Sequence, residues 1–276
     1  LVALGLRDET DADERRAASM ERLQTIGATV GAVVVAAVVG VVILWQVAPA
    51  DAVNAMGETV LFQRDTQYHR ISVTEDESSR PLRFDSSHQS AISLEDPYES
   101  RILYPDYMHL ALAANPDAER VLVLGLGGGV ITKRYWRDYP GVHVYSVEID
   151  PVVSDVAERY FWLPSDERLE VYVEDARRYV QRTDQTYDII IVDAYYSDAL
   201  PFHLTTQEFL AEMEGIMTPD GVLAYNVISS AAGGGSDLFR SMYRTAGGVW
   251  DRIFVFPIGY GADLARSGEG VAAGQR

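Results

Sequence analysis

The segment VLVLGLGGGV, residues 121–130, places four glycines directly after a short apolar run. The run 121–124 is bounded by polar residues on one side and by Gly125 on the other, which predicts a strand buried on both faces of a parallel sheet. Glycines at this point let the backbone turn sharply and bring its N–H groups close to a ligand, before a helix begins near Ile131. We therefore expect a nucleotide pocket at the end of this strand, although the glycines do not say which nucleotide.

Apolar runs then alternate with helical segments as far as residue 259. This alternation predicts an α/β fold with a doubly wound, Rossmann-like sheet of the class I methyltransferase type. Its ligands are expected at the carboxyl ends of the strands. The expected strands are 143–150, 169–173, 187–195, 221–228 and 252–259, and the expected helices are 151–161, 175–183, 205–217 and 236–246.

A different pattern precedes this sheet. Short alternating runs at 59–62, 70–74 and 82–84 are separated by polar turns, which predicts a small antiparallel β unit. A helix is expected over 98–114. The expected domains are a polar segment 1–22, a transmembrane helix 23–50, a small β domain with its connecting helix 51–115, a nucleoside-binding catalytic domain 116–260 and a polar tail 261–276.

Residues 23–50 contain no charged side chain and are apolar almost throughout. Such a length predicts a helix that spans a bilayer, with Trp45 as an interface anchor. A signal peptide fits less well because the run is too long and follows a polar, acidic stretch, and no polar face marks it as a core helix. Arginine counts around the span favour an external domain, but a nucleotide-using enzyme needs a cytoplasmic cofactor. We therefore expect a membrane protein with a cytoplasmic catalytic domain.

The net charge of −18 argues against a nucleic-acid partner, which needs clustered basic residues. Lys133 is the only lysine, and strong acidity with arginine in place of lysine is typical of proteins from salt-rich cytoplasm; compositional bias of a GC-rich genome is the alternative. Zero cysteines exclude disulfides, thiolate metal sites and a cysteine nucleophile. The expected partners are a membrane, through residues 23–50, and a small molecule, and a homo-oligomer is left open.

Three acidic residues stand at the carboxyl ends of successive strands of the predicted sheet. Glu148 lies 19 residues after Gly129, the spacing at which a carboxylate accepts hydrogen bonds from a ribose diol. Asp175 closes the next strand, where an acid either accepts from an adenine amino group or caps the following helix. Asp193 closes the strand after that and faces the same crevice. Three acids in register beside a glycine loop predict a nucleoside site.

The glycine loop narrows the choice of nucleotide. It lacks the Lys-Ser/Thr pair of a Walker loop, which argues against ATP hydrolysis. Val130 stands where a dinucleotide fingerprint has its third glycine. A cofactor without pyrophosphate, such as S-adenosylmethionine or its decarboxylated form, suits this loop better.

The sequence resembles the spermidine synthase (polyamine aminopropyltransferase) family in its membrane-fused branch. The similarity runs from residue 66 to residue 259. Its strongest elements are LGLGGG (124–129), VEIDP (147–151), EDARRYV (174–180), VDAYYSDALPFHLTTQEF (192–209) and, in the small β unit, FDSSHQSA (84–91).

The resemblance implies a role for each matching residue. Glu148 would bind the ribose, and Asp175 with Ala176 would bind the adenine. Asp193 takes the position of the family's proton acceptor, and Gln89 that of a glutamine which lines the substrate cleft.

The resemblance also counts the loop glycines, Gly125, Gly127 and Gly129, as part of the cofactor site. His69 joins that site at a position where the family usually has glutamine. Asp198 is the next acid after Asp193, five residues on rather than the usual three, and is expected to bind the amine. Gly128 stands where the family usually has an aspartate that holds the amine of the aminopropyl group.

The function favoured by these features is transfer of an aminopropyl group from decarboxylated S-adenosylmethionine to a diamine or polyamine. Asp193 would accept the proton of the attacking amine, and an acidic cleft attracts a polycation. The sulfonium is its own leaving group, so no metal is expected. Two alternatives stay open: an S-adenosylmethionine-dependent methyltransferase and a non-catalytic nucleoside-binding membrane protein.

Overall fold

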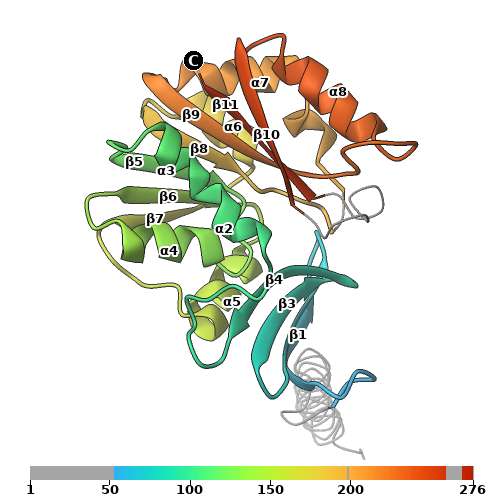
Figure 1. Ribbon diagram of the computed structural model, residues 1–276. Coiled ribbons are helices and arrows are strands. Elements are labelled where there is room, and N and C mark those ends of the chain that lie inside the picture. The colour runs from blue at the N-terminus through green and yellow to red at the C-terminus, as the bar shows by residue number, and fades with distance from the viewer. Residues whose placement is uncertain (1–52, 198, 259–268, 276) are drawn as a thin grey trace, which may run out of the picture. The chain divides into compact units, whose positions relative to one another are not determined.

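Two β-sheets make up the frame of the protein, for which we have a computed structural model that describes residues 53–197, 199–258 and 269–275 (Figure 1). All of these residues belong to one compact unit, Pro49–Arg276. The smaller sheet is an antiparallel meander in the order β1-β2-β3-β4. Its strands are β1 (Thr59–Asp65), β2 (Arg70–Glu75), β3 (Ser79–Phe84) and β4 (Ser87–Ser93).

The larger sheet has seven strands in the order β10-β11-β9-β8-β5-β6-β7. β5 to β9 are parallel to one another, whereas β11 pairs antiparallel with both β9 and β10. The strands are β5 (Arg120–Leu124), β6 (His143–Glu148), β7 (Leu169–Val173), β8 (Tyr187–Val192), β9 (Met217–Ile228), β10 (Arg252–Ile258) and β11 (Glu269–Gln275).

Helices cover both faces of this sheet, as the alternating pattern predicts. One core lies against α6, α7 and α8, and a second lies against α2, α3 and α4. The bounds are α2 (Tyr104–Met108), α3 (Leu110–Ala114), α4 (Val130–Asp138), α5 (Pro151–Phe161), α6 (Ala176–Arg182), α7 (Gln207–Gly215) and α8 (Asp237–Ala246), with a 3₁₀ turn η1 (Phe202–Leu204). The prediction of a doubly wound α/β fold, preceded in the chain by a small antiparallel sheet, is thereby confirmed.

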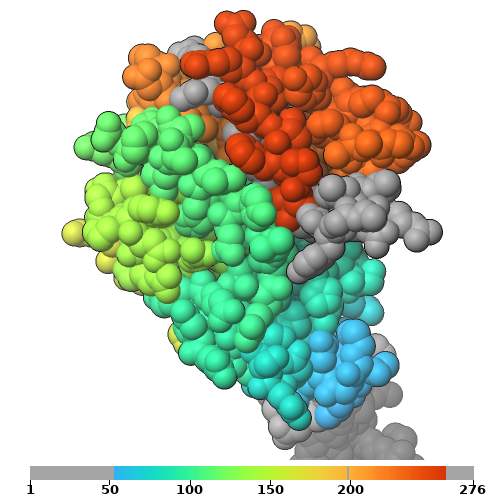
Figure 2. All heavy atoms as spheres, in the orientation of Figure 1, coloured from blue at the N-terminus to red at the C-terminus, as the bar shows by residue number. Residues whose placement is uncertain are grey.

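The small sheet is attached through α5. Val153 and Phe161 of this helix share one apolar core with Ile71 and Leu82 of β2 and β3. In the space-filling view, the blue-to-teal small sheet lies directly against the green segment that follows it (Figure 2). This packing places β4 near the glycine loop, because Gly128 donates a backbone hydrogen bond to Ser90 Oγ at 2.9 Å.

The helix expected over 98–114 is wrong in extent. Two short helices, α2 and α3, replace it, and His109 lies between them. Pro105 stands in the first turn of α2. Proline disfavours helical geometry in the residue before it and is best accommodated in a first turn, so the helix begins here rather than at residue 98.

The polar tail expected over 261–276 also needs correction. Residues 269–275 form β11, which is inserted between β9 and β10. The segment EGVAAGQ carries little apolar periodicity, so its sequence does not predict a strand. Backbone pairing to strands on both sides supplies what the side-chain pattern lacks.

The membrane localisation expected from the sequence is contradicted. Among the residues that the structure describes, no helix combines the length and the apolar character that crossing a bilayer requires. The segment 23–50, on which the expectation was based, lies outside the described residues.

Candidate active site

A cavity of about 240 Å³ lies at the carboxyl ends of the parallel strands. One wall is formed by residues that follow β5, β6, β7 and β8, together with the end of β9. The opposite wall comes from the small sheet, mainly from β4. Ligands of doubly wound sheets bind at this edge. The cavity brings together most of the residues that the sequence assigned to the site: His69, Gln89, Gly125, Gly127, Glu148, Asp175, Ala176 and Asp193.

The glycine loop contributes through its bare backbone. Gly125 has a φ of 99°, and a Cβ there would lie 2.2 Å from the carbonyl oxygen of Asp193. Glycine therefore lets the ends of β5 and β8 approach each other. Gly129, with a φ of 66°, precedes α4, and a Cβ there would lie 2.7 Å from Leu163 Cδ1. Gly129 does not line the cavity, and its geometry gives it a packing role.

Glu148 is a buried carboxylate held by backbone amides. Its Oε2 accepts a hydrogen bond from the N–H of Leu126 at 3.1 Å, and its Oε1 accepts one from the N–H of Asp150 at 3.0 Å. Burial raises the pKa of Glu148, an effect that outweighs the opposing influence of these amides. The carboxylate therefore sits where a hydroxyl donor or a cation would stabilise its charge.

Asp175 performs the capping role that the sequence left open, and it also lines the cavity. Its Oδ1 accepts from the N–H of Arg178 and caps α6. Its Oδ2 lies 3.0 Å from His203 Nε2. His203 lines the cavity as well, so the carboxylate that was expected to contact adenine shares its second oxygen with a histidine.

Asp193 follows β8 and is held by two neutral donors. Tyr104 Oη donates to its Oδ2 at 2.8 Å, and Asn226 Nδ2 donates to its Oδ1 at 2.9 Å. Both partners line the cavity with it. Neither of these two donors brings a positive charge to the carboxylate.

The segment after β8 crosses to the small sheet. Gln89 Nε2 donates to the carbonyl of Ser197 at 2.7 Å, and Ser197 Oγ donates to the carbonyl of Phe84 at 3.2 Å. His69 stacks on Phe84 with ring centroids 4.4 Å apart. Burial lowers the pKa of His69, so the ring is neutral at physiological pH. Asp198, expected to bind the amine, lies outside the described residues.

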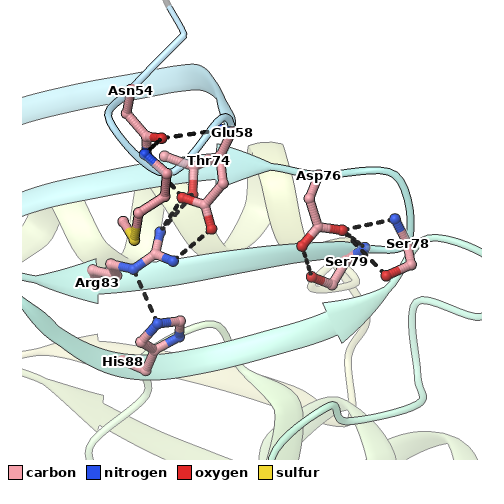
Figure 3. Close-up of polar contacts among 9 residues, drawn as sticks. Asn54, Glu58, Thr74, Asp76, Ser78, Ser79, Arg83 and His88 are labelled. Atoms are coloured by element: carbon pink, nitrogen blue, oxygen red, sulfur yellow. Dashed lines mark hydrogen bonds and ion pairs between the residues drawn. The ribbon is translucent and has the colours of Figure 1, made fainter.

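A buried polar cluster supports the small-sheet wall. Figure 3 shows the Arg83 side chain between Glu58 and His88. Its guanidinium donates to both carboxylate oxygens of Glu58, at 2.7 and 2.9 Å, and to Thr74 Oγ1. Its Nε donates to His88 Nε2 at 3.1 Å. Since arginine can only donate, Nε2 of His88 is the acceptor and its proton is on Nδ1. Burial, followed by the Arg83 charge, lowers the pKa of His88.

Comparison with known proteins identifies the family. A family model described as a spermine/spermidine synthase domain matches residues 102–229. A polyamine aminopropyltransferase from Vibrio vulnificus is 37% identical over 209 residues, which cover 72% of this chain and 68% of the relative. The chain belongs to the spermidine synthase (polyamine aminopropyltransferase) family. Its relatives are transferases, as the sequence predicts.

Solved structures agree on the fold. A probable spermidine synthase from Corynebacterium glutamicum superposes with a TM-score of 0.69 at 20% identity, covering 77% of this chain and 79% of that one. A spermidine synthase in complex with the transition-state analogue AdoDATO superposes with a TM-score of 0.66 at 20% identity, covering 78% and 73%. At this level of identity the likeness establishes the fold.

One departure from the family's usual motif has a structural explanation in this synthase-family chain. A Cβ at Gly128 would lie 2.9 Å from both Phe161 Cδ1 and Ser90 Cβ. The space that a loop aspartate would need is therefore filled by Ser90 of β4 and Phe161 of α5. Of these three residues, only Ser90 lines the cavity.

Sequence reasoning missed two polar residues of this family member's site, Tyr104 and Asn226. Tyr104 lies inside the helix expected over 98–114, and nothing in the local sequence marks it as a site residue. Asn226 stands in the run GVLAYNVI, where it is the one amide side chain among buried residues. A lone amide in such a run was the available signal.

Proposed function

We propose that this chain transfers the aminopropyl group of decarboxylated S-adenosylmethionine to a diamine or polyamine acceptor. The observation that carries the proposal is the charge of the cavity wall. Four carboxylates line it, from Glu148, Glu174, Asp175 and Asp193, and the described lining residues include no lysine or arginine. Both substrates of the reaction are cations, a sulfonium and an ammonium, so an acidic cleft attracts both.

The cavity fits the nucleoside part of that co-substrate. Gly125 and Gly127 let the backbone approach a ligand, and Glu148 is a buried carboxylate whose hydrogen bonds come from backbone N–H groups. We assign Glu148 to the ribose hydroxyls. We assign Asp175 and Ala176 to the adenine, with His203 holding the Asp175 carboxylate in place.

The chemical step needs one base and no further group. Once it has lost a proton, the nitrogen of the acceptor has a free lone pair, attacks the methylene carbon bound to the sulfonium and forms a carbon–nitrogen bond. The carbon–sulfur bond breaks and its electron pair stays on sulfur, which leaves a neutral thioether. The proton that the amine loses goes to the carboxylate of Asp193, which Tyr104 and Asn226 hold at the edge of the cavity.

A methyltransferase is the second candidate, and the lack of an acidic side chain at position 128 favours it. Because Ser90 and Phe161 fill the space of a loop acid, no carboxylate at this point repels the carboxyl group of S-adenosylmethionine. Calorimetry with the two nucleosides separates the candidates. Tighter binding of the decarboxylated form supports aminopropyl transfer, and tighter binding of the carboxylated form supports methyl transfer.

Asp193→Asn tests the assigned base. The amide keeps the shape of the side chain but loses its charge and basicity, so we expect kcat to fall by about 10²–10⁴-fold. Affinity for the nucleoside should be nearly unchanged. Asp198→Asn should weaken amine binding more than it slows turnover. If Asp193→Asn transfers aminopropyl groups as fast as the wild type, the proton acceptor is another residue.

A further inference from the structure

Asn226 lies in an unusual place for an amide. It is 1% exposed, and its neighbours along β9 from Val222 to Val227 are buried. The register between β8 and β9 pairs Val192 with Tyr225, so Asn226 stands beside Asp193, one residue beyond the last registered pair. The strand register therefore fixes which side chain of β9 meets the carboxylate.

The backbone of Asn226 is fixed as well. Its carbonyl oxygen accepts a hydrogen bond from Tyr195 Oη at 2.9 Å, and the same hydroxyl accepts from the N–H of Ile228 at 2.8 Å. Tyr195 belongs to the segment that follows Asp193. The Tyr195 hydroxyl thus links the end of β9 to the segment after β8 through two hydrogen bonds, one at Asn226 and one at Ile228.

The side-chain oxygen of Asn226 is left without a partner. Oδ1 is buried and has no hydrogen-bond donor among the residues that the structure describes. A buried polar atom in this condition costs about 1–3 kcal/mol. A leucine would fill the same position without that cost, so packing does not account for the amide. What does account for it is the other end of the group, Nδ2, which donates to Asp193 Oδ1 at 2.9 Å.

We propose that Asn226 is a positioning residue for aminopropyl transfer: its amide holds the Asp193 carboxylate in one orientation and in its ionised form. The inference rests on the function proposed above. A neutral donor is suited to this task because it stabilises the carboxylate without supplying a positive charge that would compete with the ammonium of the acceptor. An arginine in its place would orient the carboxylate but would also repel that ammonium.

Two variants separate positioning from packing. Asn226→Leu removes the donor and the orphaned oxygen together, so we expect kcat to fall by about tenfold to a hundredfold, in line with the cost of misplacing a catalytic group. The nucleoside Kd should change little, and the thermal midpoint should not fall. A residue with a merely structural role would show the reverse, a lower midpoint and an unchanged kcat.

Asn226→Asp keeps the shape but replaces the donor by a second carboxylate. Like charges side by side disfavour ionisation, so the acid limb of the kcat/KM profile should move to higher pH. Asn115→Asp is the matched control, because Asn115 Nδ2 also donates to an oxygen, the carbonyl of Asp220, but does so away from the cavity. The control should leave the profile in place.

A carbon NMR titration of the full chain makes the test independent of turnover, with Asp193→Asn used to assign the Asp193 carboxyl resonance. We expect this carboxyl to titrate at higher pH in Asn226→Asp and Asn226→Leu than in the wild type. Unchanged titration, or an unchanged kcat in both variants, would overturn the inference. If the wild type transfers no aminopropyl group but the resonance moves, the proposed function fails and the contact between Asn226 and Asp193 stands.

Discussion

Two buried carboxylates in this protein are held in opposite ways. Glu58, under the small sheet, meets the guanidinium of Arg83 at 2.7 Å. Burial raises its pKa, but hydrogen bonds from Arg83, Asn54 and Thr74 outweigh that effect and leave the pKa below its ordinary value. Glu148, at the end of β6, has backbone N–H groups as partners, and burial leaves its pKa above its ordinary value.

The difference separates structural charge from charge available to a ligand. A carboxylate that is paired with a buried cation already has its charge neutralised without a ligand, and removing the carboxylate leaves the cation buried and unpaired. When a buried carboxylate has only neutral partners, its ionised form is less stable, and a ligand hydroxyl or cation that approaches it stabilises that form. By this criterion Glu58 supports the fold, whereas Glu148 is open to a ligand, as the function proposed above requires.

The largest effect expected from this comparison is on stability. Glu58→Ala leaves Arg83 buried without its anion, which should lower the free energy of unfolding by about 3–5 kcal/mol. The stabilisation by Glu58 is complete above the ordinary glutamate pKa of 4.5 and is lost as pH falls below it, because the folded-state pKa is lowered. Urea unfolding of wild type and Glu58→Ala at pH 7 and at pH 3 measures both the loss of stability and its dependence on pH.

Asp65→Ala is the control for Glu58→Ala. Asp65 pairs with Arg70 on the surface, where both side chains are more than half exposed, so its loss should be nearly neutral. Nucleoside affinity should be retained in both variants. Equal stability of Glu58→Ala and Asp65→Ala would show that the buried pair is not structural.

Glu148→Gln should give the opposite result. The amide keeps the size of the side chain but loses the charge that we assign to the ribose hydroxyls, so nucleoside affinity should fall at least about tenfold, roughly one charge-assisted hydrogen bond. Stability at neutral pH should fall less than in Glu58→Ala: one of the two backbone N–H donors loses its acceptor, but the raised pKa of Glu148 means that its ionised form is unfavourable in the fold.

Calorimetry and thermal melts on Glu148→Gln make this comparison. Glu170→Gln is a suitable control, since Glu170 lies on the neighbouring strand β7 and is exposed. Unaltered binding by Glu148→Gln would remove this residue from the site.

The sequence predicts the parts of this arrangement that depend on neighbours along the chain. Apolar runs and glycines locate β5 and its loop, and acids that follow strands locate Glu148, Asp175 and Asp193, because each signal is local. The contacts of Asp193 depend instead on strand register and on α2, which bring Tyr104 and Asn226 from distant segments. The Glu58–Arg83 pair is equally hidden, since two charged residues 25 positions apart give no pattern. β11 could not be predicted because its sequence lacks the apolar periodicity of a strand, and its backbone pairing with β9 and β10 leaves no trace in the sequence.

Lys133 is a buried cation whose hydrogen-bond partner, like those of Glu148, is a neutral backbone group. Its side chain is fully buried, and Nζ donates to the carbonyl of Phe161 at 2.6 Å, at the end of α5. Burial lowers the pKa of Lys133 from 10.5 to about 7, with nearby Asp96 opposing the shift and Arg137 adding to it. Between these two pH values the unfolded chain keeps the proton that the folded chain has lost.

Stability attributable to Lys133 should therefore rise with pH across that window, by at most about 1.4 kcal/mol per pH unit. Lys133→Met should lack this slope. The measurement is the difference in unfolding free energy between variant and wild type from pH 7 to pH 9, which cancels the contribution of other groups. A constant difference over that range would mean that Lys133 keeps its proton in the fold.

The smallest expected effect concerns charges that are not buried at all. With a net charge of −18, repulsion among surface carboxylates should destabilise the fold at low ionic strength. Raising salt from about 0.1 M to 1 M shortens the screening length from about 10 Å to 3 Å, so the thermal midpoint should rise by about 2–4 °C for each kcal/mol recovered.

Buried pairs are screened much less than exposed charges. The midpoints of wild type and Glu58→Ala should therefore rise in parallel, with the gap between them preserved. A flat or falling midpoint would remove the interpretation of salt adaptation, and a gap that closes with salt would show that the Glu58–Arg83 pair is open to solvent.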